Sequence, residues 1–310
     1  MTLTQLSVFV LVARLGSVKA AARTLNVSEP AVSQALSALR QHLGDQLVTR
    51  GPSGMTLTPG GTRLLSIASQ MVALGAEAEA TVRAAQGAAE PLRVVATSTI
   101  AEFLSGPLID AFVTRSARKV DGSSGVAATD EMAVLVANRL SDLALGPCLR
   151  TDPHLVSEPI LRTKVVVVGS AHRPLRSDVA WLVDPTGTDP ESDAGRLLRR
   201  LRVPDSRIRV FPNQTAAWTA AADGAGIAPA LAHLVAPQLR RGDLVTVATA
   251  ATPAASALYA TTLTPDRRSA TAGAFRRFLG TPEAMHLMQA AGTGSPPSRF
   301  RPPVYVTIWS

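Results

Sequence analysis

Polar side chains between Ser28 and Arg40 recur at the spacing of one helix face, and their chemistry suits the recognition of nucleic-acid bases. Ser33 and Gln34 carry short hydrogen-bonding groups, and a Gln amide can bond the edge of an adenine in the major groove. Lys19 and Arg50 flank this face, where positive charge would meet phosphates. We expect a DNA-contacting surface made of Ser17, Lys19, Ser28, Glu29, Pro30, Ser33, Gln34, Arg40 and Arg50.

Three helices and a hairpin are predicted to hold this surface. Apolar residues at helical spacing predict a helix over residues 2–15, which Gly16 ends. Ser17 would cap a helix over residues 18–25, and Ser28 would cap a third helix that reaches Leu43. Residues 46–50 and 55–58 read as two short strands around a Gly-Pro-Ser-Gly turn. This order of elements predicts a winged helix-turn-helix over residues 1–58.

Charge by itself supports DNA binding only weakly. The net charge is +8 and the pI about 10.8, but an Arg-rich composition also follows from a GC-rich genome. Residues 1–58 hold five basic and two acidic side chains. A helical module with solvated polar faces is the alternative interpretation. The third helix lacks the Glu–Lys pairs of an ordinary solvated face, and the hairpin follows at once, so the pattern favours DNA binding.

The predicted secondary structure changes twice in the rest of the chain. Residues 59–89 predict one long helix whose apolar stripe calls for a dimer partner. Beyond Pro91, strands and helices alternate, which predicts an α/β region with mainly parallel sheets, among them separate strands over 156–159 and 163–169. One helix is expected over residues 100–115. The fold class is therefore a multidomain α+β protein, followed by a poorly ordered extension over residues 292–310.

Several classes of protein are disfavoured. A single cysteine, Cys148, forbids an intrachain disulfide and suggests a reducing cytoplasm. We see no signal peptide and no apolar run long enough for a membrane span, so no membrane partner is expected. The five histidines are scattered, and neither a P-loop nor a Gly-x-Ser-x-Gly elbow occurs. We therefore expect no enzyme, no catalytic residues, no metal and no cofactor, and disfavour a secreted solute-binding protein.

The segments at residues 6–10, 16–39, 43–44, 47–50 and 57–61, including Ser28-Glu-Pro-Ala-Val-Ser33-Gln, resemble the N-terminus of LysR-type transcriptional regulators. The resemblance continues more weakly to about residue 290. It implies a dimerising linker helix and an effector domain of two Rossmann-like subdomains similar to periplasmic binding proteins, near residues 90–162 with 266–291 and 163–265. It also implies a homotetramer, a dyad-symmetric promoter site, a small-molecule effector and RNA polymerase as a possible further partner.

Within this resemblance, Ser28, Pro30, Ser33 and Gln34 would approach bases, and Arg50 would contact the backbone or minor groove. Two residues depart from the family. Glu29 stands where many relatives have Gln, and its carboxylate repels phosphate although it can accept from cytosine. Arg40 stands where relatives often carry Glu and would add positive charge. Relatives also have a strand near residues 116–128, which Gly122-Ser-Ser-Gly125 is expected to break.

The resemblance implies an effector cleft between the subdomains. Hydroxyls and free N–H groups at predicted helix starts suit an anionic effector, although ordinary helix capping would use the same residues. Arg196, Arg199 and Arg200 share one helix face, which is either solvated or a contact with a subunit or with DNA. An architectural DNA-binding protein that ignores ligands is a further alternative. The candidate effector contacts are Thr97, Ser98, Thr99, Thr129, Thr186, Gly187, Asn213 and Gln214.

Overall fold

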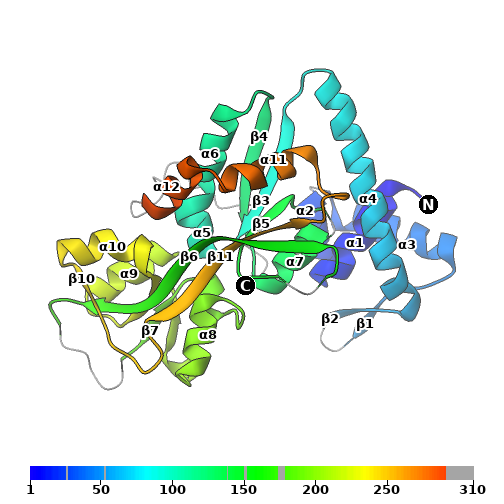
Figure 1. Ribbon diagram of the computed structural model, residues 1–310. Coiled ribbons are helices and arrows are strands. Elements are labelled where there is room, and N and C mark those ends of the chain that lie inside the picture. The colour runs from blue at the N-terminus through cyan, green and yellow to red at the C-terminus, as the bar shows by residue number, and fades with distance from the viewer. Residues whose placement is uncertain (26, 52–53, 138, 150–151, 174–178, 291–310) are drawn as a thin grey trace. The chain divides into compact units, whose positions relative to one another are not determined.

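The computed structural model describes residues 1–25, 27–51, 54–137, 139–149, 152–173 and 179–290 (Figure 1). The described chain forms two compact units, one built on Met1–Ala89 and the other on Glu90–Ala137 and the residues from Ser141. The extension predicted over residues 292–310 lies outside the described residues.

The first unit begins with three helices, α1 (Leu3–Leu15), α2 (Val18–Leu25) and α3 (Glu29–Leu43). Local signals set their ends, since Thr2 forms a capping box with Gln5, and Gly16 and Gly44 adopt left-handed conformations with φ of 62° and 68°. The helices enclose a small core that includes Leu6, Phe9, Val32, Leu36 and Leu39.

A two-stranded wing follows, with β1 (Val48–Gly51) antiparallel to β2 (Gly54–Leu57). The Asp45 carboxylate ties both ends of the wing together, because it accepts hydrogen bonds from the Leu47 N–H at 2.6 Å and the Thr58 hydroxyl at 2.7 Å. The next helix, α4 (Pro59–Ala85), starts directly against this junction. A Cβ on Gly61 would lie 2.0 Å from the Leu47 carbonyl oxygen, so only glycine permits this approach.

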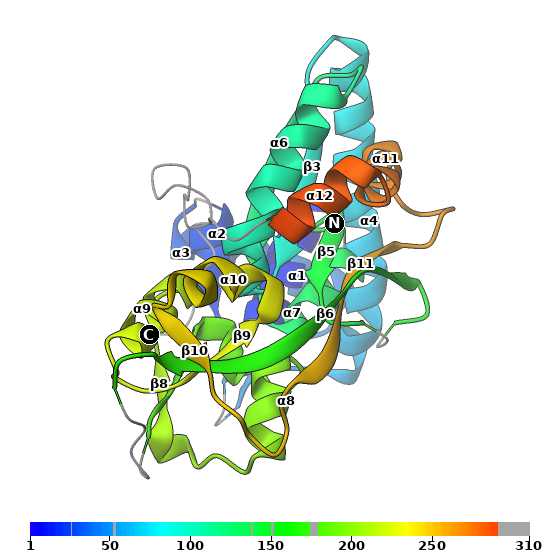
Figure 2. The same cartoon turned by 60° about the vertical axis from the view of Figure 1, so that its left-hand side comes forward.

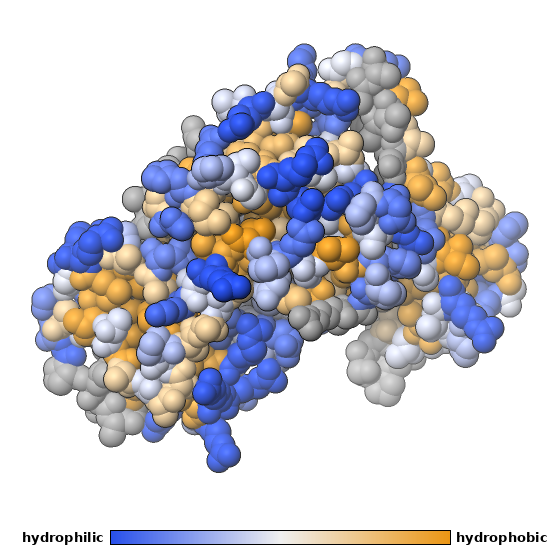
Figure 3. All heavy atoms as spheres, in the orientation of Figure 1, coloured by the Kyte–Doolittle hydropathy of each residue, from blue (hydrophilic) through white to orange (hydrophobic). Residues whose placement is uncertain are grey.

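Helix α4 carries an unburied apolar stripe of Ile67, Met71, Leu74 and Val82, which are 38–59% exposed. At 100° per residue these four side chains fall on one face of the helix. Figure 3 shows apolar surface along this helix.

The second unit is organised by a seven-stranded sheet in the order β10-β6-β11-β5-β3-β4, with β9 paired to β6. Its strands are β3 (Glu90–Ala96), β4 (Val120–Val126), β5 (Leu143–Gly146), β6 (Leu155–Ser170), β9 (Ala228–Leu231), β10 (Leu244–Thr246) and β11 (Ala254–Leu263). A separate parallel pair is formed by β7 (Trp181–Val183) and β8 (Ile208–Val210). The helical segments are α5 (Ser98–Ile100), η1 (Ala101–Ser105), α6 (Gly106–Arg115), α7 (Thr129–Ala137), η2 (Pro185–Thr188), α8 (Asp193–Arg200), η3 (Asp205–Arg207), α9 (Gln214–Ala222), α10 (Ala232–Arg241), α11 (Ala270–Leu279) and α12 (Pro282–Ala290).

Two lobes share this sheet. We call the lobe around β3, β4 and β5 the first subdomain and the lobe around β7, β9 and β10 the second subdomain (Figure 1). The long strands β6 and β11 pair antiparallel along their length and run from one lobe into the other (Figure 2).

The prediction of mainly parallel sheets is wrong. Only the pairs that β3 makes with β4 and β5, and the β7–β8 pair, are parallel ladders in the described residues, and the other ladders are antiparallel. The prediction also divided β6 into two strands, over residues 156–159 and 163–169. Instead, β6 is continuous and contains a bulge, because the register shifts so that Pro159 faces Tyr259 while Leu161 faces Leu258. A bulge is a position where a strand tolerates a proline, which has no N–H for the ladder.

The expected break at residues 122–125 is also wrong, since β4 pairs with β3 without interruption from Val120 to Val126. Glycine serves packing here rather than ending the strand. A Cβ on Gly122 would lie 2.3 Å from Cγ2 of Ile109, so its absence lets α6 lie close against β4.

The helix predicted over residues 100–115 contains a π-helical turn, η1, at Ala101–Ser105. Pro107 follows in the next turn and lacks an N–H for an ordinary helical bond. A widened turn before a proline is one way a helix accommodates the lost bond and the bulk of the ring. The π turn carries Glu102, whose carboxylate reaches the start of α9.

Candidate DNA interface and effector cleft

Helix α3 separates cleanly into a packed face and a free face. Val32, Leu36 and Leu39 are buried against α1 and α2, whereas Ser33 and Gln34 are exposed. Glu29 and Pro30 are exposed in the first turn. The free face therefore presents the predicted polar side chains on a rigid element.

The other predicted DNA contacts flank α3 in different ways. Ser28 is exposed, and its hydroxyl accepts from the Ala31 N–H at 3.3 Å, which makes it the helix cap. Ser17 directly precedes α2, and Lys19 is exposed on that helix. Arg50 lies on β1 opposite Met55, and its side chain is outside the described part of the structure.

Arg40 has contacts that the sequence did not suggest. Its Nε donates to the Gln46 carbonyl at 2.7 Å, and its Nη2 donates to the Val48 carbonyl at 2.8 Å. The guanidinium thus links the last turn of α3 to the first residue of the wing. This geometry gives Arg40 a positioning role within the domain in addition to any effect of its charge on DNA.

A cavity that opens to solvent lies between the two subdomains. Five predicted effector contacts line it, namely Thr97, Thr99, Thr186, Gly187 and Gln214. Ser98, Thr129 and Asn213 do not line this cavity. Sequence reasoning missed several polar lining residues, which are Thr163, Asp184, Ser192, Asp193, His233 and Ser256.

Asp184 is the most deeply buried acid of the cavity, with 2% of its surface exposed. Its carboxylate accepts from the Thr99 hydroxyl of the first subdomain at 2.7 Å and from the Thr186 hydroxyl at 3.2 Å. Burial raises the pKa of Asp184, and the hydroxyl hydrogen bonds oppose this shift. The Thr186 hydroxyl in turn accepts from the Ser98 N–H at 3.1 Å, so this cluster crosses the cleft.

Glu102 crosses the cleft in the opposite direction, from the first subdomain to the start of α9. Its carboxylate accepts from the N–H groups of Gln214 at 2.9 Å and Thr215 at 3.2 Å, and from the Thr215 hydroxyl. Burial is the main cause that raises the pKa of Glu102, and the nearby Asp184 charge adds to it. Beside this contact, Phe103 stacks on Trp218 with ring centroids 5.2 Å apart.

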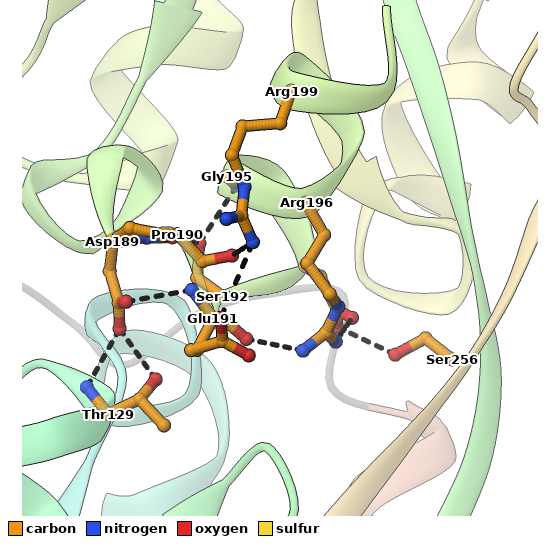
Figure 4. A network of polar contacts seen from close by, with 10 residues as sticks. Thr129, Asp189, Pro190, Glu191, Ser192, Gly195, Arg196, Arg199 and Ser256 are labelled. Atoms are coloured by element: carbon orange, nitrogen blue, oxygen red, sulfur yellow. Dashed lines mark hydrogen bonds and ion pairs between the residues drawn. The ribbon is translucent and has the colours of Figure 1, made fainter.

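Asp189 makes a third contact between the subdomains. Its carboxylate accepts from the Thr129 N–H at 2.7 Å and the Thr129 hydroxyl at 2.5 Å, at the first turn of α7 (Figure 4). Thr129 therefore contacts the second subdomain rather than the cavity.

The loop that carries Asp189 is held by the basic helix α8. Arg199 donates to the Pro190 carbonyl at 2.5 Å, and Arg196 donates to the Glu191 carbonyl (Figure 4). Within α8, Arg196 also donates to the Asp193 carboxylate at 2.7 Å. Both arginines remain exposed. Both guanidinium groups thus have their hydrogen-bond partners within α8 and the loop before it.

His233 lines the cavity with an incompletely used imidazole. Its Nδ1 lies 2.8 Å from the Thr163 hydroxyl, whereas Nε2 is buried and has no hydrogen-bond partner among the described residues. Burial lowers the pKa of His233, which favours the neutral ring.

No group of three His, Cys, Asp or Glu side chains with the arrangement of a metal site occurs in the described residues. Within the same residues, no helix is long and apolar enough to cross a membrane.

Comparison with known proteins identifies both parts of the chain. Residues 3–62 match the family model of bacterial regulatory helix-turn-helix proteins of the lysR family, and residues 85–281 match the LysR substrate binding domain. An uncharacterised HTH-type transcriptional regulator of Mycobacterium tuberculosis is 32% identical over the whole of both chains. The HTH-type transcriptional regulator CfxR of Cupriavidus necator is 28% identical, over 82% of this chain and 83% of its own length.

Solved structures share the fold. ArgP from Mycobacterium tuberculosis superposes with a TM-score of 0.57 at 22% identity, covering 93% of this chain and 97% of its own. Full-length CbnR in complex with its target DNA superposes with a TM-score of 0.53 at 21% identity, covering 90% and 99%. These likenesses confirm the predicted fold class.

The family assignment decides between the functional alternatives. A solute-binding protein does not account for the match at residues 3–62, and the relatives are named as regulators rather than as enzymes. The chain therefore belongs to the LysR family of bacterial transcriptional regulators, in which a DNA-binding helix-turn-helix domain precedes an effector-binding domain.

Proposed function

We propose that this regulator reads a dyad-symmetric promoter site with α3 and responds to a small molecule bound in the cleft between its subdomains. The observation that carries the DNA part is the division of α3, where three apolar side chains are buried and Ser33 and Gln34 are exposed. A helix anchored on one face can present the other to the major groove.

Individual contacts follow from the chemistry of each side chain. Ser33 and Gln34 would hydrogen-bond base edges, and Glu29 would accept from cytosine N4. Ser28 and Pro30 would approach the bases beside them. Ser17, Lys19 and Arg50 would contact the phosphate backbone.

The apolar stripe on α4 supports a dimer. Ile67, Leu74 and Val82 are each more than half exposed on one helix face, which favours a second copy of this helix as the partner. Two such dimers would form a homotetramer, as the sequence resemblance implies. We propose that the protein acts on promoter DNA in the cytoplasm, with RNA polymerase as a further partner.

The effector part of the proposal is supported by the cavity and by the position of Thr97, Thr99, Thr186 and Gln214 in its wall. Because the wall comes from both subdomains, a bound ligand would change the free energy of their closure. In an architectural DNA-binding protein that ignores ligands, the closure of the subdomains would not depend on a small molecule.

A footprint across the nearest divergent promoter tests the DNA proposal. Gln34→Ala should reduce discrimination at one base pair by about 1–3 kcal/mol, while the matched exposed variant Gln86→Ala should leave the site preference unchanged. An unchanged sequence preference of Gln34→Ala would remove the role proposed for this residue.

A further inference from the structure

We propose that the effector carries a protonated amine and that Asp184 supplies the opposing charge in the cleft. This inference rests on the proposed effector-binding function and names the chemical class of the ligand. It differs from the anionic effector that the hydroxyls and helix starts suggest in the sequence.

The charged residues of the cavity wall favour a cationic ligand. The described residues that line the cavity include the acids Asp184 and Asp193 and no Lys or Arg. Asp193 is already paired, since it accepts from Arg196 at 2.7 Å and from the Ser256 hydroxyl at 2.7 Å. In the described structure Asp184 accepts from neutral groups, which are the hydroxyls of Thr99 and Thr186 and the backbone N–H groups of Thr99 and Gly187, and it forms no ion pair there.

Two of the helix starts that the sequence offers to an anion are already occupied by the protein's own carboxylates. Glu102 takes the N–H groups at the start of α9, and Asp189 takes the Thr129 N–H at the start of α7. An anionic effector at either of these starts would have to displace a carboxylate, and elsewhere in the cleft it would face the buried Asp184. Like charges within a few ångströms disfavour each other's ionised form, so such a ligand gains little.

The neutral groups of the wall are suited to an ammonium. An ammonium has three donors and no acceptor, and the oxygens of Thr97, Thr99, Thr163 and Thr186 can accept its hydrogen bonds. His233 adds a neutral imidazole whose Nε2 is unpartnered in the described structure and becomes an acceptor when Nδ1–H donates to Thr163. An ammonium would also offset the cost of burying the Asp184 carboxylate.

Apolar side chains complete the wall, which indicates a carbon skeleton next to the amine. They are Ile100, Leu104, Leu161, Val165, Leu231 and Leu258. A short aliphatic amine matches this combination of one buried acid, several hydroxyls and an apolar surround.

Three probes with the same four-carbon chain isolate the effect of charge. Putrescine, 1,4-butanediol and succinate are titrated into the full-length protein at constant ionic strength, with thermal unfolding and calorimetric binding as measurements. We expect putrescine to stabilise the protein and the other two to have no effect. Asp184→Asn should weaken putrescine binding at least tenfold, while the exposed control Asp121→Asn should bind as the wild type does.

The outcomes separate the ligand class from the effector function itself. Stabilisation by succinate or butanediol but not putrescine, lost in Thr99→Val, would overturn the amine and keep a ligand-binding cleft. Unchanged putrescine binding in Asp184→Asn would overturn the role of Asp184. No stabilisation by putrescine or by either other probe would overturn the amine and count against effector binding in the cleft, whereas DNA footprints would still report on the winged helix.

Discussion

Replacing Arg40 by Met should loosen the wing without removing a phosphate contact. The guanidinium donates to the carbonyls of Gln46 and Val48 at 2.7 and 2.8 Å, and the second bond is partly buried. A hydrogen bond to a charged group contributes about 1.5–3 kcal/mol when it is protected from water. Water competes for the exposed bond to Gln46, so we expect about 2 kcal/mol for the pair. Met keeps the apolar stem and removes only the donors.

Hydrogen exchange on the full-length protein measures this loss locally. A loss of about 2 kcal/mol should speed exchange of the wing amides near Leu47 and Val48 by about 30-fold, while amides in α1 keep their protection. Lys19→Met is the matched control, because Lys19 is exposed on α2 and is proposed to contact phosphate.

DNA binding supplies the second readout. Lys19→Met should reduce the magnitude of the slope of log Kobs against log salt by about 0.9, and exchange in the wing should not change. Arg40→Met should speed exchange of the wing amides and leave the slope as in the wild type. If Arg40→Met reduces the magnitude of the slope and leaves wing exchange unchanged, the guanidinium contacts DNA instead of holding the wing.

Three further predictions concern the second unit. Gly122→Ala should destabilise it by about 1–3 kcal/mol in chemical denaturation, because the new Cβ would lie 2.3 Å from Cγ2 of Ile109; wild-type stability would mean that α6 shifts freely. Burial raises the pKa of Asp184 in the folded state, so the stabilising effect of this carboxyl is fully present at low pH and is lost as pH rises through the raised pKa. Asp184→Asn should therefore match the wild type at low pH and exceed its stability once the pH has risen through the raised pKa, and a variant less stable than the wild type above that pH would contradict this account. Asp189→Asn should weaken the contact with Thr129 and speed exchange at the start of α7, whereas Glu191→Gln on the same loop should not; equal exchange in both variants would show that Asp189 does not hold the subdomains together.

The elements of the winged helix could be predicted because their signals are local. Ser28 caps α3 through Ala31, three residues away, and Gly16 and Gly44 end helices by their own backbone conformation. Apolar spacing then identifies which face is buried and leaves Ser33 and Gln34 outside. Even here the partners of Arg40 were missed, because a guanidinium on an exposed helix face carries no sign of which carbonyls it will meet.

Tertiary structure decided the strand at residues 120–126. Gly and Ser have little preference for strands, so the local sequence indicates a break. The deciding contact is with Ile109 on a helix that precedes the strand, where any side chain on Gly122 would collide. Close packing between elements overrode local propensity.

The sequence by itself determined that residues 97–99, 129 and 213–214 stand at helix starts with free N–H groups and hydroxyls. It did not determine what those groups bind. Carboxylates 60 and 112 residues away along the chain fill two of these positions, and the third turns its hydroxyl to the buried Asp184. A helix start attracts any negative group, from a ligand or from the protein, so only the fold, by bringing distant acids across the cleft, decides which one it receives.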